Sequence, residues 1–348
     1  MNRFDIFKTL VSISSPSLRE NEIKEYIKNF LLPLRYQFRE DSIGNIIFFK
    51  DLKAVKNTLV CHMDTVKDAE AVNLLEDDER FYTNNTALGA DDKCAIAIML
   101  ELAEKEACDS AAFLFFVAEE IGLYGSANMD SSLLEGLEST NFFILDAQGD
   151  VGEIINEAVG KTRVTLTCHG VAAHAGFEPE NGINAIKVLA NIALIIPQGR
   201  PNSISTCNIG SFIAEGSTNV VPALASLTFE VRSLDDKVRD KIVDAIISEG
   251  KKIAKEHSAS LDSKIEVLYD HYKIAEDDKI VIKAKKAIKN ARITSTTGGS
   301  DANSLNKKGY KAIVLSCGYH NPHSKNEYIT KLELDKLYDV SRNLIVED

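Results

Sequence analysis

The sequence predicts an α/β protein whose mixed, mainly parallel sheet is flanked by helices and interrupted by an inserted α+β domain. Up to about Asp146, short continuous apolar runs alternate with helical patterns, which is typical of parallel strands joined by crossover helices. Beyond Gly160, apolar and polar residues alternate one by one, as they do in half-exposed antiparallel strands. The first pattern returns near Asp277. We therefore expect domain boundaries of 1–160, 161–270 and 271–348, with the middle segment inserted.

Composition places the chain among globular proteins and limits the kinds of partner that we expect it to bind. Its 348 residues exceed the usual size of one domain, which is about 150 residues. The formal net charge is -12 and no basic stripe is present, so we expect neither nucleic acid nor a membrane surface as a partner. The six cysteines form no C-x-x-C pair, no apolar run is long enough to span a membrane, and the start lacks a signal-peptide core. We expect a cytoplasmic protein.

The first part of the chain is predicted to supply most of the α/β domain. Helices are expected over residues 4–12 and 17–31, where Ser17 and Glu20 fit a capping box. Ile96, Leu100 and Ala103 share one helical face, which predicts a buried helix behind Asp91. Residues 65–87 are predicted as a loop with an edge hairpin. The expected strands are 43–49, 58–61, 111–117 and 141–145.

The inserted segment is predicted to form a ferredoxin-like unit. Strands are expected over residues 161–168, 203–214, 223–232 and 264–268, with helices over 182–196 and 234–257. Their succession is the β-α-β-β-α-β order of that unit. The remaining chain returns to the first domain through elements predicted at 277–290 (helix), 312–317 (strand) and 330 to about 346 (helix).

Imidazole and carboxylate side chains follow several of the predicted strands. They are His62, Asp91, Glu119, Glu120, Asp146 and His323. Because the carboxyl ends of parallel strands line the ligand crevice of such sheets, we expect at least four of them to meet there. Imidazole and carboxylate ligands without thiolate suit zinc, cobalt or manganese. Each residue also has an ordinary explanation (a helix cap, a packed core histidine, surface charge), so the prediction depends on the combination.

Spacing suggests separate roles within this set. His62 and Asp64 are two residues apart on an extended segment, so Asp64 can accept the second imidazole N–H of His62. Glu119 and Glu120 must point in different directions, so that one can bind a metal while the other accepts a proton. Asp91, at the start of a helix, suits a carboxylate shared by two ions, while Asp92 can still cap that helix.

Nine short motifs, in order along the chain, resemble those of the co-catalytic dizinc metallopeptidases of the peptidase T (tripeptidase) and carboxypeptidase G type, the peptidase T-like branch above all. They are Cys61-His-Met-Asp-Thr-Val, Leu88-Gly-Ala-Asp-Asp-Lys, Ala118-Glu-Glu-Ile-Gly, Leu145-Asp-Ala, Ala172-Ala-His-Ala-Gly, Ser217-Thr-Asn-Val-Val-Pro, Val231-Arg-Ser, Gly298-Gly-Ser-Asp-Ala-Asn and His323-Ser-Lys-Asn-Glu-Tyr-Ile. The motifs cover nearly the whole chain, including the inserted segment.

The resemblance implies a fold and a metal centre. The fold would be that of the zinc aminopeptidases, similar to phosphorylase/hydrolase-like proteins, with an inserted ferredoxin-like lid or dimerisation domain. The cofactors would be two Zn²⁺ ions, for which Co²⁺ or Mn²⁺ can substitute. Asp91 would bridge both ions. His62 and Asp146 would complete one site, and Glu120 and His323 the other.

The resemblance also implies catalytic and substrate-binding residues. Glu119 would be the general base, Asp64 would orient His62, and the Asp91–Asp92 peptide bond would be cis. His174, Asn219 and Arg232 would bind substrate, with Arg232 suited to a substrate carboxylate. His320 would line the pocket at most. The protein would be a homodimer through its inserted domain and would release N-terminal residues from short peptides.

One departure from the family pattern leaves the substrate open. Thr297 stands before Gly298-Gly299, where the tripeptidase prototype has an arginine suited to the peptide C-terminus. An alternative is the same scaffold acting as an N-acyl amino acid deacylase or a carboxypeptidase. A binding protein without activity is a further alternative, but the full set of ligand and base residues argues against it.

Overall fold

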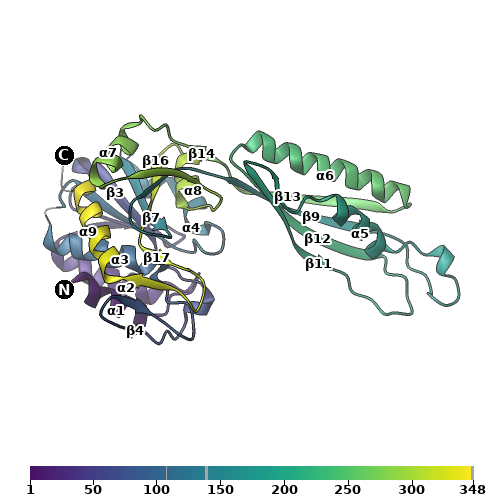
Figure 1. The fold of residues 1–348 in the computed structure, drawn as a ribbon, viewed down its shortest axis with the longest axis horizontal. Helices are drawn as coiled ribbons and strands as arrows, with labels where there is room; N and C mark the ends of the chain where they lie inside the picture. The colour runs from purple at the N-terminus through teal and green to yellow at the C-terminus, as the bar shows by residue number, and fades with distance from the viewer. Residues whose placement is uncertain (107, 138–139, 346–348) are drawn as a thin grey trace. The chain divides into compact units, whose positions relative to one another are not determined.

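The computed structural model describes residues 1–106, 108–137 and 140–345. The chain forms two compact units (Figure 1), which are described one at a time. Unit 1 consists of Met1–Glu157, Lys273–Thr296 and Ser300–Asp348, and unit 2 of Ala158–Tyr272 and Thr297–Gly299. Unit 1 is therefore built from segments that precede and follow most of unit 2 in the sequence.

Unit 1 is built on a mixed sheet with the strand order β1-β2-β6-β3-β7-β16-β8, continued by β14, and with β15 paired to β8. Its central strands β6, β3, β7 and β16 are parallel, while β1, β2 and β8 pair antiparallel. The predicted α/β class is confirmed. The strands are β1 (Gln37–Glu40), β2 (Ile46–Phe49), β3 (Asn57–His62), β6 (Ala111–Phe116), β7 (Asn141–Ala147), β8 (Glu153–Ala158), β14 (Tyr272–Lys273), β15 (Arg292–Thr296) and β16 (Lys311–Ser316).

Helices cover this sheet. α1 (Arg3–Ser12), α2 (Asn21–Leu31), α3 (Ala90–Lys105) and α9 (Lys331–Ile345) pack together, and α3 and α9 contact β3. α4 (Tyr124–Ala127) packs on α8 (Asp301–Lys307), and α7 (Lys279–Ala287) and α8 contact β16. The predicted end of the last helix at Val346 lies outside the described residues. Within the described ranges, no helix is both long enough and apolar enough to cross a bilayer.

A small antiparallel sheet with the order β17-β18-β5-β4 holds the loop that carries His323. Its strands are β4 (Leu75–Glu76), β5 (Arg80–Tyr82), β17 (Tyr319–His320) and β18 (Tyr328–Thr330). β4 and β5 form the hairpin predicted within residues 65–87. Short 3-10 helices complete the unit: η1 (Leu32–Leu34), η2 (Leu52–Ala54), η3 (Lys67–Ala69) and η4 (Ser131–Leu134).

Unit 2 is an antiparallel sheet with the order β10-β11-β12-β9-β13, and both of its long helices pack on one face (Figure 1). Along β9 and β12 every second residue is buried against those helices, which is the predicted period-two pattern. Its elements are β9 (Gly160–His169), η5 (Pro179–Asn181), α5 (Ala185–Ile195), β10 (Gly199–Asn202), β11 (Ser205–Ile213), β12 (Leu224–Ser233), α6 (Asp236–Glu256) and β13 (Ser260–Tyr269).

The predicted capping box at Ser17 and Glu20 is wrong. α2 begins at Asn21, and the Glu20 side chain makes no cap hydrogen bond to it. Glu20 instead accepts the N–H groups of Leu18 and Ala118, and the Ser17 hydroxyl donates to Asp64. Both polar side chains therefore serve tertiary contacts, which compete successfully with local capping.

Candidate metal centre

The edge of the sheet in unit 1 gathers the side chains that the sequence singled out. His62 is the last residue of β3, Asp146 lies near the end of β7, and Glu119 and Glu120 follow β6. These three strands are parallel, so their carboxyl ends meet. Asp91 comes from the start of α3, and His323 comes from the loop between β17 and β18.

Asp91 lies at the centre of this group, between two imidazoles. Its Oδ1 is 3.1 Å from Nε2 of His62, and its Oδ2 is 3.3 Å from Nε2 of His323. Nε2 of His62 is also 3.6 Å from Oδ1 of Asp146, while Nε2 of His323 is 2.9 Å from Oε1 of Glu120. Two neighbouring sets of ligand atoms thus share one carboxylate, which is the arrangement that two adjacent cations require.

The start of α3 is shaped around these contacts. The peptide bond between Asp91 and Asp92 is cis, as the resemblance implied, and neither residue has helical dihedral angles. The expectation that Asp92 caps the helix is wrong, because its Oδ2 accepts the main-chain N–H of His62 at 3.3 Å. The carboxyl oxygens of Asp92 also belong to a group with His62 and Asp146 whose ligand atoms lie within 4.8 Å of one another.

Asp64 supports two parts of the site at once. Nδ1 of His62 is 2.9 Å from the main-chain oxygen of Asp64 and 3.4 Å from its Oδ1. The Asp64 carboxylate accepts the N–H of Glu119 at 2.9 Å, the N–H of Glu120 at 3.2 Å and the hydroxyl of Ser17 at 2.7 Å. Asp64 therefore fixes both the ring of His62 and the main chain of the Glu119–Glu120 pair.

Glu20 also contacts the site, and this contact was not predicted from the sequence. Its Oε1 accepts the N–H of Ala118 at 3.0 Å, so Glu20 and Asp64 together hold three successive N–H groups. Ala118 has a φ of 52°, in the left-handed region, which the two carboxylates help to maintain. No pattern around Glu20 distinguishes this contact from an ordinary helix start.

The surroundings perturb the acidic side chains in opposite directions. Burial raises the pKa of Glu119 well above its ordinary value, and the charge of Asp146 adds to this effect. Burial likewise raises the pKa of Glu120 and of Asp146. Burial also opposes ionisation of Asp91, but its hydrogen bonds with His323 and His62 outweigh that effect and lower its pKa.

The two imidazoles carry raised pKa values. Hydrogen bonds with Asp91 and Glu120 raise the pKa of His323 to about 10. Burial of His62 opposes its protonation, but contacts with Asp146, Asp64 and Asp91 raise its pKa well above the ordinary value. Both rings are therefore surrounded by more negative charge than they can balance.

The charge balance of the cluster fits divalent cations. It contains five carboxyl groups, and among the described residues no lysine or arginine forms an ion pair with any of them. Two imidazoles cannot neutralise them, and buried carboxylates remain ionised only when they are paired or bound to metal. The five groups belong to Asp91, Asp92, Glu119, Glu120 and Asp146.

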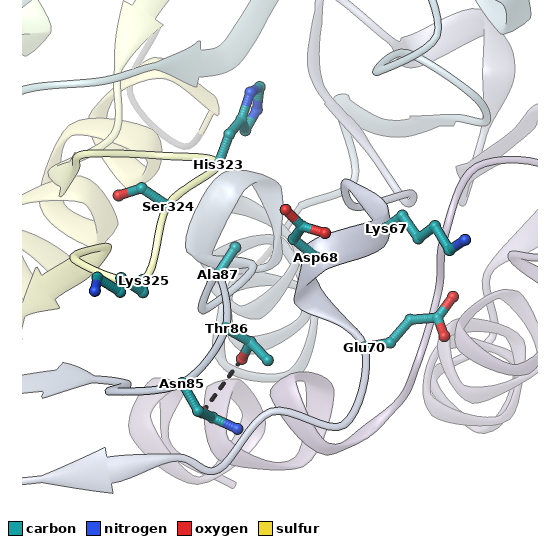
Figure 2. A pocket seen from close by; sticks show the side chains of 9 residues that line it. All are labelled: Lys67, Asp68, Glu70, Asn85, Thr86, Ala87, His323, Ser324 and Lys325. Carbon is teal, nitrogen blue, oxygen red and sulfur yellow. Dashed lines mark hydrogen bonds between the residues drawn. The ribbon is translucent and has the colours of Figure 1, made fainter.

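A cavity of about 560 Å³ opens beside His323 (Figure 2). Its walls come from three segments that each adjoin a residue of the cluster: Lys67 to Glu70 after His62, Asn85 to Ala87 before Asp91, and His323 to Lys325. The side chain of His323 is 49% exposed, so this ring lies at the open side of the group. A small substrate therefore has space next to the candidate ligands.

His320 lies outside the ligand group. Its Nε2 is 3.1 Å from Oδ1 of Asp150, and its ring stacks on Tyr328 with centroids 4.9 Å apart. This arrangement agrees with the prediction that His323, and not His320, belongs to the cluster.

Unit 2 carries the remaining sequence-predicted residues. Nδ1 of His174 accepts the N–H of Gly176 at 3.1 Å and the N–H of Phe177 at 3.2 Å, which leaves Nε2–H as a donor. The next residue, Ala175, donates its N–H to the main-chain oxygen of Asn219 at 2.9 Å. The structure therefore brings His174 and Asn219 together.

Arg232 lies elsewhere in unit 2. Its Nε donates to Glu230 at 2.7 Å, and its Nη1 donates to the main-chain oxygen of Thr297 at 3.0 Å. The segment with His174 adjoins the Leu224 end of β12, eight residues from Arg232, which is about 26 Å of extended chain. His174 and Arg232 are thus at opposite ends of one strand.

Comparisons with known proteins agree with this architecture. Residues 156–258 match the model of the M20 dimerisation domain, described as a peptidase dimerisation domain, and residues 53–169 match the model of peptidase family M28. The chain is 31% identical to the uncharacterised protein YqjE of Bacillus subtilis, over 98% of this chain and 96% of that protein. It resembles the solved structures of a tripeptidase from Staphylococcus aureus (28% identity, TM-score 0.91) and of aminopeptidase PepT from Bacillus cereus (29% identity, TM-score 0.87), each covering 99% of this chain and 97% of the other.

Proposed function

The chain belongs to the M20 family of metallopeptidases, and on this premise we propose that it is an aminopeptidase that releases N-terminal residues from short peptides, as a tripeptidase does. One observation carries the proposal: the carboxylate of Asp91 faces an imidazole with each of its oxygens. The tripeptidase and the aminopeptidase among the similar structures support the substrate class.

The donor set fits a pair of Zn²⁺ ions, for which Co²⁺ or Mn²⁺ can substitute. Asp91 would bridge the two ions, His62 and Asp146 would complete one site, and Glu120 and His323 the other. When bound, such a pair would supply Lewis-acid chemistry, polarising the scissile carbonyl and lowering the pKa of a water molecule. The excess of five carboxyl groups over two imidazoles supports this assignment.

Glu119 is the proposed general base. Its main chain is fixed by Asp64, while no hydrogen bond or ion pair of its carboxylate occurs within the described part of the chain. Burial raises the pKa of Glu119 well above its ordinary value, which makes its carboxylate a stronger base. Glu119 would accept the proton of the attacking water and deliver it to the leaving amine.

His174, Asn219 and Arg232 are the proposed substrate-binding residues. The free Nε2–H of His174 suits a developing oxyanion, and the guanidinium of Arg232 suits a carboxylate. A tripeptide spans only about 10 Å when extended. It cannot reach both His174 and Arg232 of one chain, because they lie at opposite ends of β12. We therefore propose a homodimer, in which a second copy supplies one of these contacts.

We also propose that the protein works in the cytoplasm. All six cysteines are free and buried, as expected in a reducing compartment.

A paired peptide library tests the proposed activity. Free short peptides and their N-acetylated counterparts are digested with Zn²⁺- or Co²⁺-loaded protein, and the products are identified by mass spectrometry. We expect release of N-terminal residues from the free peptides only. Equal cleavage of the acetylated set would contradict the aminopeptidase assignment and favour a deacylase or a carboxypeptidase.

A further inference from the structure

Glu327 is a buried carboxylate that accepts hydrogen bonds from three main-chain N–H groups. It is 1% exposed. Its Oε2 accepts the N–H of Leu88 at 2.8 Å and of Gly89 at 3.1 Å, and its Oε1 accepts the N–H of Asp91 at 3.2 Å. Within the described residues, no lysine, arginine or histidine forms an ion pair with it. The three N–H donors, together with the charge of the buried Lys93, offset the cost of burying this carboxylate.

Glu327 also belongs to the segment that carries His323. Its own main-chain N–H donates to the oxygen of Ser324 at 3.1 Å, which closes the turn directly after His323. One residue is therefore bonded to the His323 turn through its main chain and to Asp91 through its carboxylate. Nε2 of His323 and Oδ2 of Asp91 are 3.3 Å apart, and any shift between the two segments changes that distance.

We propose that Glu327 is a positioning residue that fixes Asp91 relative to His323 and so shapes the cation site made by Asp91, Glu120 and His323. This role rests on the proposed function, because it assumes that these side chains bind a metal ion. The other cation site, with His62 and Asp146, has only Asp91 in common with the site that Glu327 shapes. Loss of the Glu327 carboxylate therefore affects the two sites unequally.

The Glu327→Gln variant of the full chain tests this role. The substitution replaces one acceptor oxygen by an NH₂ group, which cannot accept a main-chain N–H. We expect the wild-type protein to bind two equivalents of Co²⁺. The variant should bind one equivalent with nearly unchanged affinity and the second about 10–100-fold more weakly, the usual effect of losing a residue that orients a ligand. Competition with a chromophoric chelator measures both affinities, and the Co²⁺ absorption spectrum reports the geometry at the second site.

Asp41→Asn is the matched control. Oδ1 of Asp41 also accepts three main-chain N–H groups, those of Ile43, Gly44 and Asn45, in the turn before β2. This variant should lose thermal stability and keep both Co²⁺ affinities. The positioning role would be overturned if Glu327→Gln weakened the binding of both Co²⁺ ions equally, or if it lowered stability and left both affinities unchanged. A wild-type protein that binds fewer than two Co²⁺ ions would overturn the proposed function and, with it, the premise of this role.

Discussion

Asp91 and Asp92 are adjacent in sequence but use their carboxylates differently. Asp91 faces His62 and His323, whereas Asp92 accepts the main-chain N–H of His62. A carboxylate between two imidazoles is available to two cations, while one bonded to the main chain holds the strand end in place. The sequence pattern alone does not distinguish these roles, because both residues stand at the start of the same helix.

At the scale of single residues, Glu119 gives the sharpest prediction. Glu119→Gln should keep two equivalents of metal and lose about 10²–10⁴-fold in kcat, because the amide cannot accept a proton. Metal analysis and initial rates on a free peptide measure both quantities. Glu135→Gln, an exposed glutamate outside the cluster, is the control and should behave as wild type. Turnover near the wild-type rate in Glu119→Gln would refute its role as the base.

The part of the site that could be predicted from sequence consists of charged or imidazole side chains that follow an apolar strand. His62, Asp146 and the Glu119–Glu120 pair each follow an apolar run, and a buried charge there requires a functional explanation. The contacts of Glu20 and Glu327 were not predictable in the same way. Both act through hydrogen bonds to the main chain of segments distant in sequence, and the identity of a glutamate does not reveal which N–H groups it will meet.

At the scale of elements, the connection between β6 and α4 holds Glu119, the proposed general base, in place. A Cβ at Gly125 would lie 2.1 Å from the main-chain oxygen of Val117 and 2.6 Å from Oδ1 of Asn45. The close approach of α4 to the end of β6 therefore requires glycine. Because Glu119 and Glu120 lie within this connection, its geometry also sets theirs.

Gly125→Ala should therefore reduce stability and activity together. We expect a loss of about 1–3 kcal/mol in the free energy of unfolding, the usual cost of forcing an extra methyl group into a packed region. Denaturant unfolding measures it, and a rate assay shows the accompanying loss of turnover. Gly210→Ala in β11 is the control, because a Cβ there meets no atom within 4 Å. Equal stability of the two variants would contradict the argument.

The loop of unit 2 that carries His174 gives a separate prediction. Among the residues that the structure describes, the ring of His174 hydrogen-bonds with two N–H groups of its own loop and stacks on the ring of Phe177, with centroids 4.2 Å apart. His174→Ala should therefore leave the melting temperature and the metal content unchanged while kcat falls at least about 10-fold, because the proposed oxyanion donor is lost. His169→Ala removes an exposed partner of Asp262 in the same unit and should not affect turnover. If His174→Ala retained full turnover, the inserted unit would serve assembly alone.

Several of the strands that were not predicted from the sequence share a physical cause. β1, β10 and β15 contain no fully buried residue and few apolar residues to mark them. β8 lies beyond the parallel core and pairs with β16 over only part of its length. Such strands form because a neighbouring strand offers its free edge, so their own sequence carries little of the signal. The central strands, buried on both faces, were predicted to within a few residues.

At the scale of the whole molecule, the excess of carboxyl groups couples stability to pH and to metal. Burial raises the pKa values of Glu119 and Asp146 in the folded protein. A carboxyl group with a raised pKa contributes stability below its ordinary pKa, near 4, and that contribution is lost as the pH rises through the raised value. The metal-free protein should therefore become less stable as the pH increases from about 4 toward neutral.

Metal loading should raise the melting temperature and reduce this pH dependence. Ions that bind the folded state stabilise it by mass action, and their positive charge offsets the repulsion among the carboxylates. Scanning calorimetry of chelator-treated and Zn²⁺-loaded protein at several pH values measures both effects. Asp91→Asn should reduce the response to Zn²⁺, because it weakens the shared ligand. Melting temperatures that coincide with and without Zn²⁺ at every pH would contradict this prediction.

Unit 2 is inserted into the sequence of unit 1. The order of synthesis on the ribosome therefore limits the order in which the two units can fold. Unit 2 is almost entirely one continuous stretch, so it can fold as soon as it emerges. Unit 1 then still lacks β16, which lies inside its sheet, and also His323 and Glu327. The nascent chain thus carries His62, Asp91 and Glu120 without their last partner. A hydrolase organised in this way completes its candidate metal centre only late in its own synthesis, after the whole of the main segment of unit 2 has emerged.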